Sequence, residues 1–225
     1  MKIGIIAALD CEMTEFCHDF GAVESEHFGV YVGKCGHHDV YICLAGVGKV
    51  NAAANTQRLI DLFGVDYVIN SGVAGCTAKH LGVCDVVISS TLTYHDFHPL
   101  NILDKYAPGT SVFEADEKLV SLAKNACNEI KDEGFRYDTG MIVTGDIFVE
   151  DSNVVARLRD EFNAYCTEME GAAVAHVCVL NKVPFVVIRA MSDNADESAD
   201  MSFEEMAAIA AKRAGFVATY IISNL

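Results

Sequence analysis

The feature that most constrains this chain is the alternation of short apolar, β-branched runs with longer helix-forming segments. The runs at residues 2–8 (KIGIIAA), 66–71 and 185–191 (FVVIRAM) are largely apolar at successive positions. Such runs are typical of strands that are buried on both faces, rather than of strands with one face in water. Helices between the strands would supply the cover. The order therefore predicts an α/β fold built from layers.

The other predicted elements fit this alternation. Further strands are expected at residues 30–33, 40–45, 83–90 and 137–144. Helices are expected at residues 10–20, 46–63, 116–132, 152–162 and 168–180, and a last helix is expected to begin at the capping-box pair Ser202 and Glu205. Residues 97–114 carry two of the three prolines and no periodicity, which predicts a long functional loop. No linker or repeat interrupts the chain, so we expect a single domain over residues 1–225.

The net charge of the chain narrows the classes of partner that it can bind. The formal net charge is −16, from 16 basic and 32 acidic residues. A protein that grips a nucleic-acid backbone or an anionic membrane needs clustered Lys and Arg, which this balance does not supply. We therefore expect neither partner, and a small neutral or zwitterionic ligand stays open.

The cysteines and the apolar segments bear on location. There are nine cysteines, an odd number, with no CxxC pair and several within apolar runs. Cysteines of this kind behave as small hydrophobic residues in a reducing compartment. The sequence shows no signal-peptide core and no 18-residue apolar span. These features predict a cytoplasmic protein.

Two possible cofactor motifs fail on inspection. The segment 46–49 (GVGK) resembles the end of a Walker loop, but Cys43 and Val50 occupy the positions of its first glycine and its Ser/Thr. No GxGxxG follows the first strand. His95 and His98 are spaced as two zinc ligands could be, and His37 and His38 lie in a predicted turn, but no third and fourth ligand matches them. We expect no metal and no cofactor.

Three acidic residues follow predicted strands or begin a predicted helix, where α/β sheets collect ligands. Glu12 follows the first strand, Glu170 lies in the segment TEMEGA, and Asp193 follows the last strand. Each has a plain structural explanation as well. Glu12 could stabilise a helix N-terminus, Glu170 could face solvent, and Asp193 could cap a turn.

Seven segments, in order, carry a resemblance to a known family. They are MKIGIIAALDCEM, AGVGKVNAA, NSGVAG, YHD, TGDIFV, EMEGAAVAHV and VPFVVIRAMSD. Together they resemble bacterial 5′-methylthioadenosine/S-adenosylhomocysteine nucleosidases of the nucleoside phosphorylase superfamily. The resemblance implies a three-layer α/β/α sandwich with a mixed, partly closed central sheet, working as a homodimer.

The resemblance also implies a reaction and four catalytic residues. Water would cleave the N-glycosidic bond of methylthioadenosine or adenosylhomocysteine, releasing adenine and the 5-thioribose. Asp193 would act as the acid at adenine N7, with a pKa raised by an apolar pocket. Glu12 would take a proton from the attacking water. Glu170 would hold the ribose hydroxyls and favour the cationic sugar, and Arg189 would help to place the water and the carboxylates.

Binding roles follow from the same resemblance. Phe148 would stack on the purine, the Val149 backbone would read its edge, and Met169 would pack beneath the ribose. Ser192 would support Asp193 or the base. An apolar slot for the 5′ group would be lined by Leu9, Val47 and Phe203. Four further residues are expected near the substrate, namely Val73, Ala74, Gly75 and Glu168, and Ala195 completes the set.

Two departures from the family bear on the nucleophile. Val73 stands where the family has a serine, and Asn70 stands where phosphorylases place a phosphate-binding arginine. Both favour water over phosphate. The segment after YHD also departs, which leaves the 5′ preference open. Three alternatives remain: a nucleosidase for 5′-deoxyadenosine or a futalosine-type compound, a purine nucleoside phosphorylase, and a non-catalytic nucleoside-binding protein.

Overall fold

A computed structural model describes residues 1–130, 134–193 and 203–225, with only the backbone at residues 203 and 204. The strands in chain order are β1 (Lys2–Ala7), β2 (Val23–Glu24), β3 (Val30–Cys35), β4 (His38–Leu44), β5 (Tyr67–Cys76), β6 (Val86–Tyr94), β7 (Phe113–Glu114), β8 (Tyr137–Thr144), β9 (Ala164–Glu168) and β10 (Phe185–Asp193). The helices are α1 (Asp10–Asp19), α2 (Lys49–Phe63), α3 (Glu117–Glu129), α4 (Ser152–Phe162), α5 (Gly171–Asn181) and α6 (Phe203–Ser223), with a 3₁₀ turn at Leu100–Ile102.

The strands form one mixed sheet that closes on itself at one end. β5 pairs in parallel with β10, which runs antiparallel to β6. β6 and β8 are parallel, as are β8 and β9, and β9 returns antiparallel to β5. These five strands complete a circuit, and β1, β4, β3 and β2 extend from it as an open arm. The predicted mixed, partly closed sheet is confirmed.

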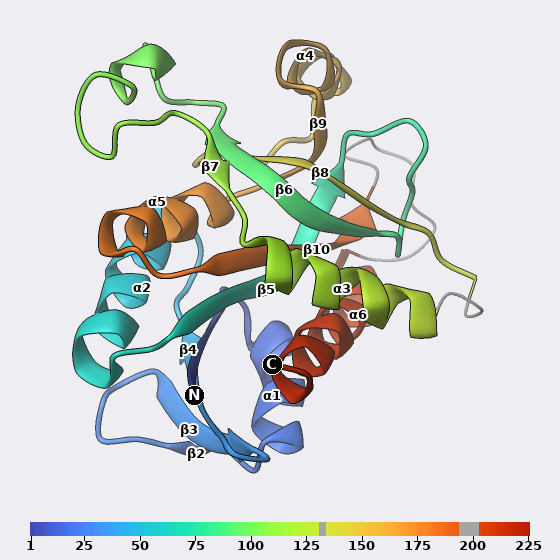
Figure 1. The fold of residues 1–225 in the computed structure, drawn as a ribbon. Coiled ribbons are helices and arrows are strands. Elements are labelled where there is room, and N and C mark those ends of the chain that lie inside the picture. Colours follow the sequence, from blue (N-terminus) through green and yellow to red (C-terminus); the bar gives the residue numbers. More distant parts are fainter. Residues whose placement is uncertain (131–133, 194–202) are drawn as a thin grey trace.

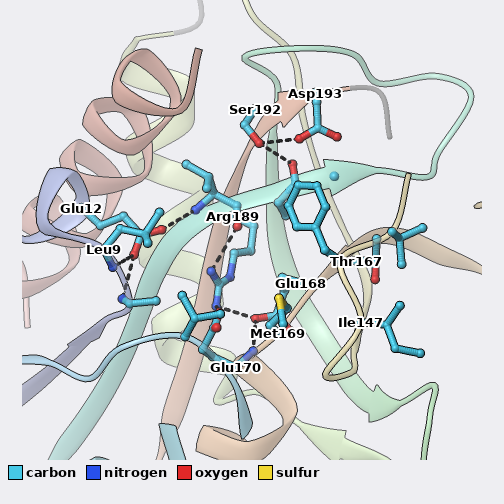
Figure 2. Close-up of a pocket in the computed structure, with 17 residues that line it drawn as sticks. Leu9, Glu12, Ile147, Thr167, Glu168, Met169, Glu170, Arg189, Ser192 and Asp193 are labelled. Atoms are coloured by element: carbon cyan, nitrogen blue, oxygen red, sulfur yellow. Dashed lines mark hydrogen bonds and ion pairs between the residues drawn. The ribbon is translucent and has the colours of Figure 1, made fainter. Parts of the chain in front are cut away.

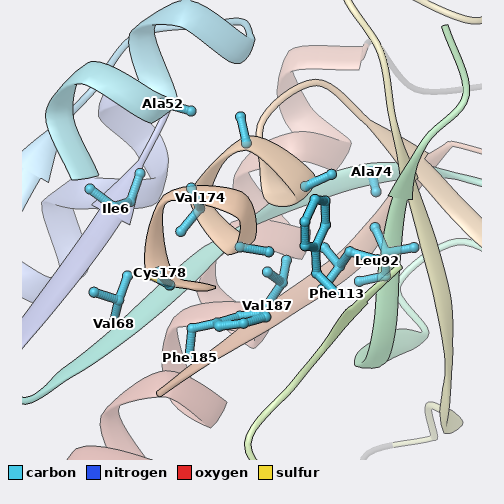
Figure 3. Close-up of a cluster of buried hydrophobic side chains, with 14 of the residues drawn as sticks. Ile6, Ala52, Val68, Ala74, Leu92, Phe113, Val174, Cys178, Phe185 and Val187 are labelled. Atoms are coloured by element: carbon cyan, nitrogen blue, oxygen red, sulfur yellow. The ribbon is translucent and has the colours of Figure 1, made fainter. Parts of the chain in front are cut away.

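Helices cover both faces of the sheet and create two large cores, while α4 covers a smaller apolar cluster that includes Val143 and Leu158. Figure 1 shows α2 and α5 on one face, and α1, α3 and α6 on the other. Successive strand residues face opposite sides, so β10 sends Val187 into the first core and Val186 and Ile188 into the second. Figure 3 shows α5 within the first core, where Val174 and Cys178 lie near Phe185 and Val187. Burial on both faces explains why the strand runs are apolar at successive positions.

Helix α6 is the one described helix with the length and composition to cross a membrane. Its apolar stretch Glu205–Ser223 has a mean hydropathy of 1.2, and half of it is buried inside the protein. Ala210, Ala214 and Val217 are fully buried in the second core, and α6 contacts β10, β5, α1 and α3. Lys212 and Arg213 interrupt the stretch. These contacts are those of a core helix.

The structure differs from the sequence prediction at two places that matter for the site. β5 does not end at Ser71 but continues to Cys76, because its second half pairs with both β10 and β9. Residues 164–168 form strand β9, which was missed, and α5 begins at Gly171 rather than at Glu168. A five-residue strand is too short to show a period, so the Ala-rich helix after it dominated the pattern.

The predicted long loop at residues 97–114 is largely irregular and ends in β7. Leu103 is buried in the first core and anchors it, whereas Phe97, Ile102 and Tyr106 are exposed. The proposed capping residue Ser202 lies outside the described residues.

Candidate active site

A cavity of about 190 Å³ lies where β1, β5, β9 and β10 end. Its walls also include the segments that follow β4 and β8. The lining residues come from six parts of the chain: Ala8, Leu9, Glu12, Val47, Val73, Ala74, Gly75, Ile147, Phe148, Val149, Thr167, Glu168, Met169, Glu170, Arg189, Ser192 and Asp193. Figure 2 shows Glu12 and Asp193 on separate elements of this wall, with Arg189 between them in the view.

The structure brings most of the predicted site residues together. All four expected catalytic residues line the cavity, as do ten of the expected substrate-binding residues. Ala195 lies outside the described residues, and the side chain of Phe203 is not described. The roles of these residues remain predictions, because placement around a cavity does not by itself assign chemistry.

Ala8, Ile147 and Thr167 also line the cavity and were not predicted from the sequence. Ala8 and Ile147 adjoin the predicted Leu9 and Phe148, so extending each motif by one residue would have found them. Thr167 belongs to the unrecognised strand β9. Its Oγ1 is buried without a hydrogen-bond partner among the described residues.

Glu12 is held by backbone amides. It lies in the first turn of α1 and is 3% exposed. Its Oε2 accepts hydrogen bonds from the N–H groups of Ala8 (2.8 Å) and Leu9 (3.0 Å), and its Oε1 accepts one from Val73 (3.0 Å). The helix-terminus role weighed from the sequence is therefore present, but the third bond reaches across to β5. Glu12 both caps α1 and stands at the cavity.

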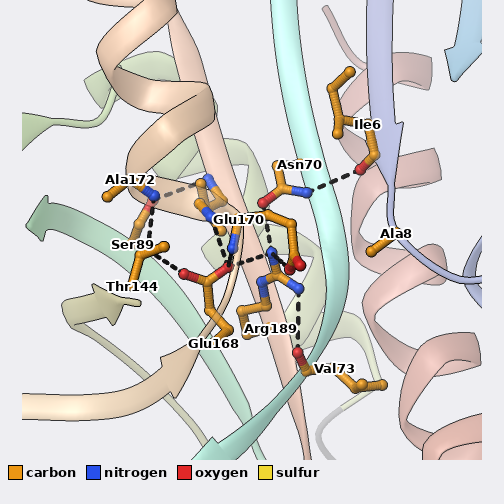
Figure 4. A network of polar contacts seen from close by, with 12 residues as sticks. Ile6, Ala8, Asn70, Val73, Ser89, Thr144, Glu168, Glu170, Ala172 and Arg189 are labelled. Carbon is orange, nitrogen blue, oxygen red and sulfur yellow. Dashed lines mark hydrogen bonds and ion pairs between the residues drawn. The ribbon is translucent and has the colours of Figure 1, made fainter. Parts of the chain in front are cut away.

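Arg189 is the centre of the polar network in Figure 4. Its side chain is 1% exposed, and its Nη2 donates to Asn70 Oδ1 (2.6 Å) and to Glu168 Oε2 (2.5 Å). Its Nη1 donates to the Val73 carbonyl at 3.1 Å. Burial alone lowers the pKa of Arg189, but the nearby carboxylates, Glu168 foremost, outweigh burial and raise that pKa. The guanidinium is therefore a permanent cation.

Glu168 serves Arg189 and the backbone. Besides the bond to Arg189, its carboxylate accepts from the N–H groups of Glu170 (3.0 Å) and Gly171 (2.6 Å) and from the Thr144 hydroxyl. The Thr144 hydroxyl accepts in turn from the Ala172 N–H at 2.8 Å. These bonds lock the turn between β9 and α5, which carries Met169 and Glu170 into the cavity wall.

Glu170 is more loosely paired. Its Oε1 accepts from the Gly48 N–H at 2.9 Å, and its Oε2 lies 3.4 Å from Arg189 Nη2. The residue is 4% exposed, so the exposed-face alternative weighed from the sequence is wrong. Burial raises the pKa of Glu170 from its ordinary 4.5 to about 7, against the opposing effect of Arg189. Its charge therefore changes near neutral pH.

Asp193 ends β10 and is only partly buried. The Ser192 hydroxyl donates to Asp193 Oδ2 at 2.7 Å and lies 3.4 Å from the Ala74 carbonyl. This contact between neighbouring residues fixes the orientation of the carboxylate. The remaining wall is mostly apolar, and Ile147 and Phe148 are 53% and 58% exposed.

The histidines weighed as metal ligands do not gather. Among the described residues, no group of three or more His, Cys, Asp or Glu is placed to hold a metal ion. His95 instead packs against Gly145, where an added Cβ would lie 2.3 Å from its Nε2.

Comparisons with known proteins match the whole chain. The family model for the phosphorylase superfamily matches residues 2–223. A 5′-methylthioadenosine/S-adenosylhomocysteine nucleosidase of Geobacillus sp. is 39% identical over 232 residues, which cover 100% of this chain and 99% of that protein.

Solved structures agree with the sequence relatives. A nucleosidase of the same name from Colwellia psychrerythraea, in complex with adenine, superposes with a TM-score of 0.91 at 36% identity, covering 100% of this chain and 96% of that one. A futalosine hydrolase mutant of Helicobacter pylori superposes with a TM-score of 0.89 at 33% identity, over 100% of both chains. The chain belongs to the 5′-methylthioadenosine/S-adenosylhomocysteine nucleosidase family of the phosphorylase superfamily.

Proposed function

We propose that this protein hydrolyses the N-glycosidic bond of 5′-methylthioadenosine, S-adenosylhomocysteine or both, releasing adenine and the 5-thioribose. The observation that carries the proposal is the convergence of four residues on one cavity from three parts of the chain: Glu12 from α1, Glu170 from the turn before α5, and Arg189 and Asp193 from β10. The family relationship supplies the substrate class.

Cleavage of an N-glycoside builds positive charge on the ribose and negative charge on the purine. Asp193 donates a proton or a hydrogen bond to N7 as the base leaves. Glu12 accepts a proton from the attacking water; its oxygens can take a further bond besides those from the backbone, because a carboxylate offers about four lone-pair sites. Paired carboxyl groups with opposed duties are the general arrangement for glycoside hydrolysis.

Glu170, with Arg189 behind it, holds the ribose. The carboxylate at Glu170 accepts hydrogen bonds from the sugar hydroxyls, and its charge favours the cationic sugar of the transition state. Phe148 stacks on the purine, Val149 offers its backbone to the purine edge, and Met169 packs under the sugar.

Water, rather than phosphate, is the proposed nucleophile. Among the described residues that line the cavity, Arg189 is the sole Lys or Arg. Its Nη atoms already donate to Asn70, Glu168 and Val73. Three carboxylates, from Glu12, Glu168 and Glu170, surround the same region, and their field repels an incoming anion. Asn70 engages Arg189 instead of forming an anion site.

The proposal leaves two candidates for the 5′ substituent of the nucleoside. Leu9 and Val47 give the cavity apolar lining, which suits an alkylthio group. The likeness to a futalosine hydrolase keeps a nucleoside with another 5′ substituent as the second candidate. Both candidates use the same catalytic groups.

A panel of nucleosides tests the function. Methylthioadenosine, adenosylhomocysteine, 5′-deoxyadenosine and futalosine are incubated with the protein, with and without phosphate, and the free base and sugar are identified. We expect base release from the thioethers that does not depend on phosphate. A ribose 1-phosphate product, or a rate that rises saturably with phosphate, would contradict hydrolysis. Base release from futalosine alone would transfer the proposal to the second candidate.

We also propose that the protein works as a homodimer in the cytoplasm. Exposed apolar side chains at Val47, Val50 and Phe97 support a partner at the cavity mouth. The nine free cysteines suit a reducing compartment.

A further inference from the structure

A partly buried ion network joins three segments that are far apart in sequence. Lys49 Nζ lies 2.7 Å and 2.6 Å from the two carboxylate oxygens of Asp96 and 3.5 Å from Asp146 Oδ2. Two backbone bonds complete the link: the Lys49 N–H donates to Asp146 Oδ1, and the Asp146 N–H donates to Asp96 Oδ2, both at 2.9 Å. The start of α2, the end of β6 and the segment after β8 are thereby tied together.

The Lys49–Asp96 pair of the network is partly shielded from solvent, whereas the Asp146 side chain is 48% exposed. The side chains of Lys49 and Asp96 are 22% and 16% exposed, whereas those of the surface pair Lys34 and Asp39 are 76% and 40% exposed. Burial by itself raises the pKa of Asp96, but Lys49 and the Asp146 N–H outweigh it, so that pKa lies below its ordinary value. Partly buried ion pairs are screened less than exposed ones. The contact therefore holds its segments more firmly than a surface pair does.

Two of the three tied segments carry a part of the cavity wall. Asp146 directly precedes Ile147, Phe148 and Val149. Lys49 directly follows Gly48, whose N–H binds Glu170. An added Cβ at Gly48 would lie 3.2 Å from Asp146 Oδ1, so the two segments approach each other closely.

Residues 146–149, the purine segment, need a contact of this kind to hold them in place. The side chain of Ile147 is 53% exposed, so packing contributes little to fixing it. The base of the segment is held by the Gly145 N–H, which donates to the Glu168 carbonyl at 3.1 Å. Beyond it, Asp146 supplies charged contacts immediately before the cavity-lining residues.

We propose that Lys49, Asp96 and Asp146 are positioning residues that set the purine segment 146–149 at a fixed distance from the Gly48 turn and Glu170. The base and the ribose of one nucleoside then contact their respective binding groups at the same time. The network touches no substrate itself. The segment 46–49, which resembles a phosphate loop in sequence, thus acts through its lysine on a neighbouring loop. This inference rests on the proposed function for its substrate.

The test compares Lys49→Met, Asp146→Ala and the double variant with wild type. A misplaced purine segment weakens ground state and transition state alike, so we expect KM for methylthioadenosine to rise about tenfold or more with kcat within about threefold. The adenine dissociation constant, measured by calorimetry, rises in parallel. In the double variant the effects are not additive, because both changes break one network.

Two further variants keep the test sharp. Lys34→Met breaks a 2.7 Å pair on the β3–β4 hairpin and should leave KM and adenine affinity unchanged. Asp146→Asn keeps an acceptor for the Lys49 N–H and should raise KM less than Asp146→Ala does; it carries the test if the alanine variant does not fold.

Variants that fold with KM and adenine affinity within about twofold of wild type would overturn the proposal, whatever their thermal midpoint. A fall in kcat at constant KM would overturn it too. Adenine binding requires no turnover. A wild type that binds adenine but cleaves no nucleoside would therefore refute the proposed function and leave this test in place.

Discussion

The ionisation of Glu170 changes the charge of the cavity with pH. Its pKa is raised to about 7 because the carboxylate is buried, and the proposed mechanism needs its negative charge beside the sugar. Below that pH the group becomes neutral. It still fills the same space, but it no longer stabilises a cation.

The first prediction is an acid limb in the pH profile. For wild type, kcat/KM should fall about tenfold per pH unit below about 7, since this ratio reports ionisations of the free enzyme. Glu170→Gln should be slower at neutral pH and lack that limb. A wild-type profile that stays flat from pH 8 to pH 5 would contradict the assignment.

The same ionisation predicts a trend in stability. A carboxyl whose pKa is raised on folding contributes stability below its unfolded pKa and loses that contribution as pH rises through its folded pKa. The thermal midpoint of Glu170→Gln relative to wild type should therefore increase from pH 4.5 to about 7 and then level off. Scanning calorimetry of both proteins across this range checks the sign.

At the scale of elements, the extended strand β5 brings the proposed catalytic groups together. Gly72 on β5 stands in register with Arg189 on β10. A Cβ at Gly72 would lie 2.5 Å from both Arg189 Nη1 and Glu12 Oε1. The absent side chain is therefore what lets a guanidinium and a carboxylate approach the same strand.

The second prediction concerns Gly72→Ala. The methyl group must displace Arg189 or Glu12, so we expect a loss of stability of about 1–3 kcal/mol, as for other overpacked sites. Turnover per folded molecule should fall about tenfold or more, because displacement of about 1 Å already disrupts a catalytic arrangement. Gly82→Ala is the control, because its nearest contact would be Arg136 Nη2 at 3.7 Å. Denaturant titration and steady-state kinetics of both variants give the comparison.

Sequence patterns predicted the elements that are long and apolar. β1 and β10 were found because both of their faces are buried, and Glu12 and Asp193 were located by their positions after these strands. The end of β5 was misplaced because Gly72 and Gly75 look like a turn locally, and only pairing with β9 and β10 keeps them extended. β9 was missed because five residues are too few to show a period, and Thr167 was missed with it.

Contacts between side chains that are far apart in the sequence could not be predicted from it. Nothing local indicates that Asn70 accepts a bond from Arg189, or that Lys49 pairs with Asp96 and Asp146. Such pairs depend on loop paths and on closure of the sheet. Residues that line the cavity could be inferred from the family resemblance, whereas the groups that hold them in place could be identified only from the structure.

At the scale of the whole molecule, exposed apolar side chains lie on segments next to the cavity-lining ones. Val50 follows Lys49 in the chain and is 80% exposed. Phe97, which follows Asp96, the partner of Lys49, is also exposed. Ile147 and Phe148 follow Asp146 in the same network. A second copy covering this region would remove the apolar surface from water and close the cavity.

The third prediction is that Val50→Lys weakens dimerisation. A charge at the centre of an apolar interface opposes its burial, so light scattering should show a larger monomer fraction, together with a higher KM. Phe28→Lys, at a position that is 88% exposed in the turn between β2 and β3 of the open arm, should change neither. A wild-type protein that is monomeric and fully active at nanomolar concentration would contradict the dimer.

The most direct test of the account is the turnover of Asp193→Asn per folded molecule. An amide keeps the contact with Ser192 and can still bond to the purine, but it cannot give up a proton. We expect kcat to fall by ~10²–10⁴, the usual contribution of a positioned proton donor. Glu12→Gln should fail to a similar degree, and Asp138→Asn, whose partner is His80 on the surface, should not.

Turnover and thermal midpoint are measured on the same preparations. If Asp193 serves only as a turn cap, its substitution costs about 1 kcal/mol of stability and leaves turnover nearly unchanged. If Asp193 is the general acid, we expect the reverse, a nearly unchanged midpoint with a large loss of rate. A well-folded Asp193→Asn protein that retains more than about a tenth of wild-type turnover would contradict it.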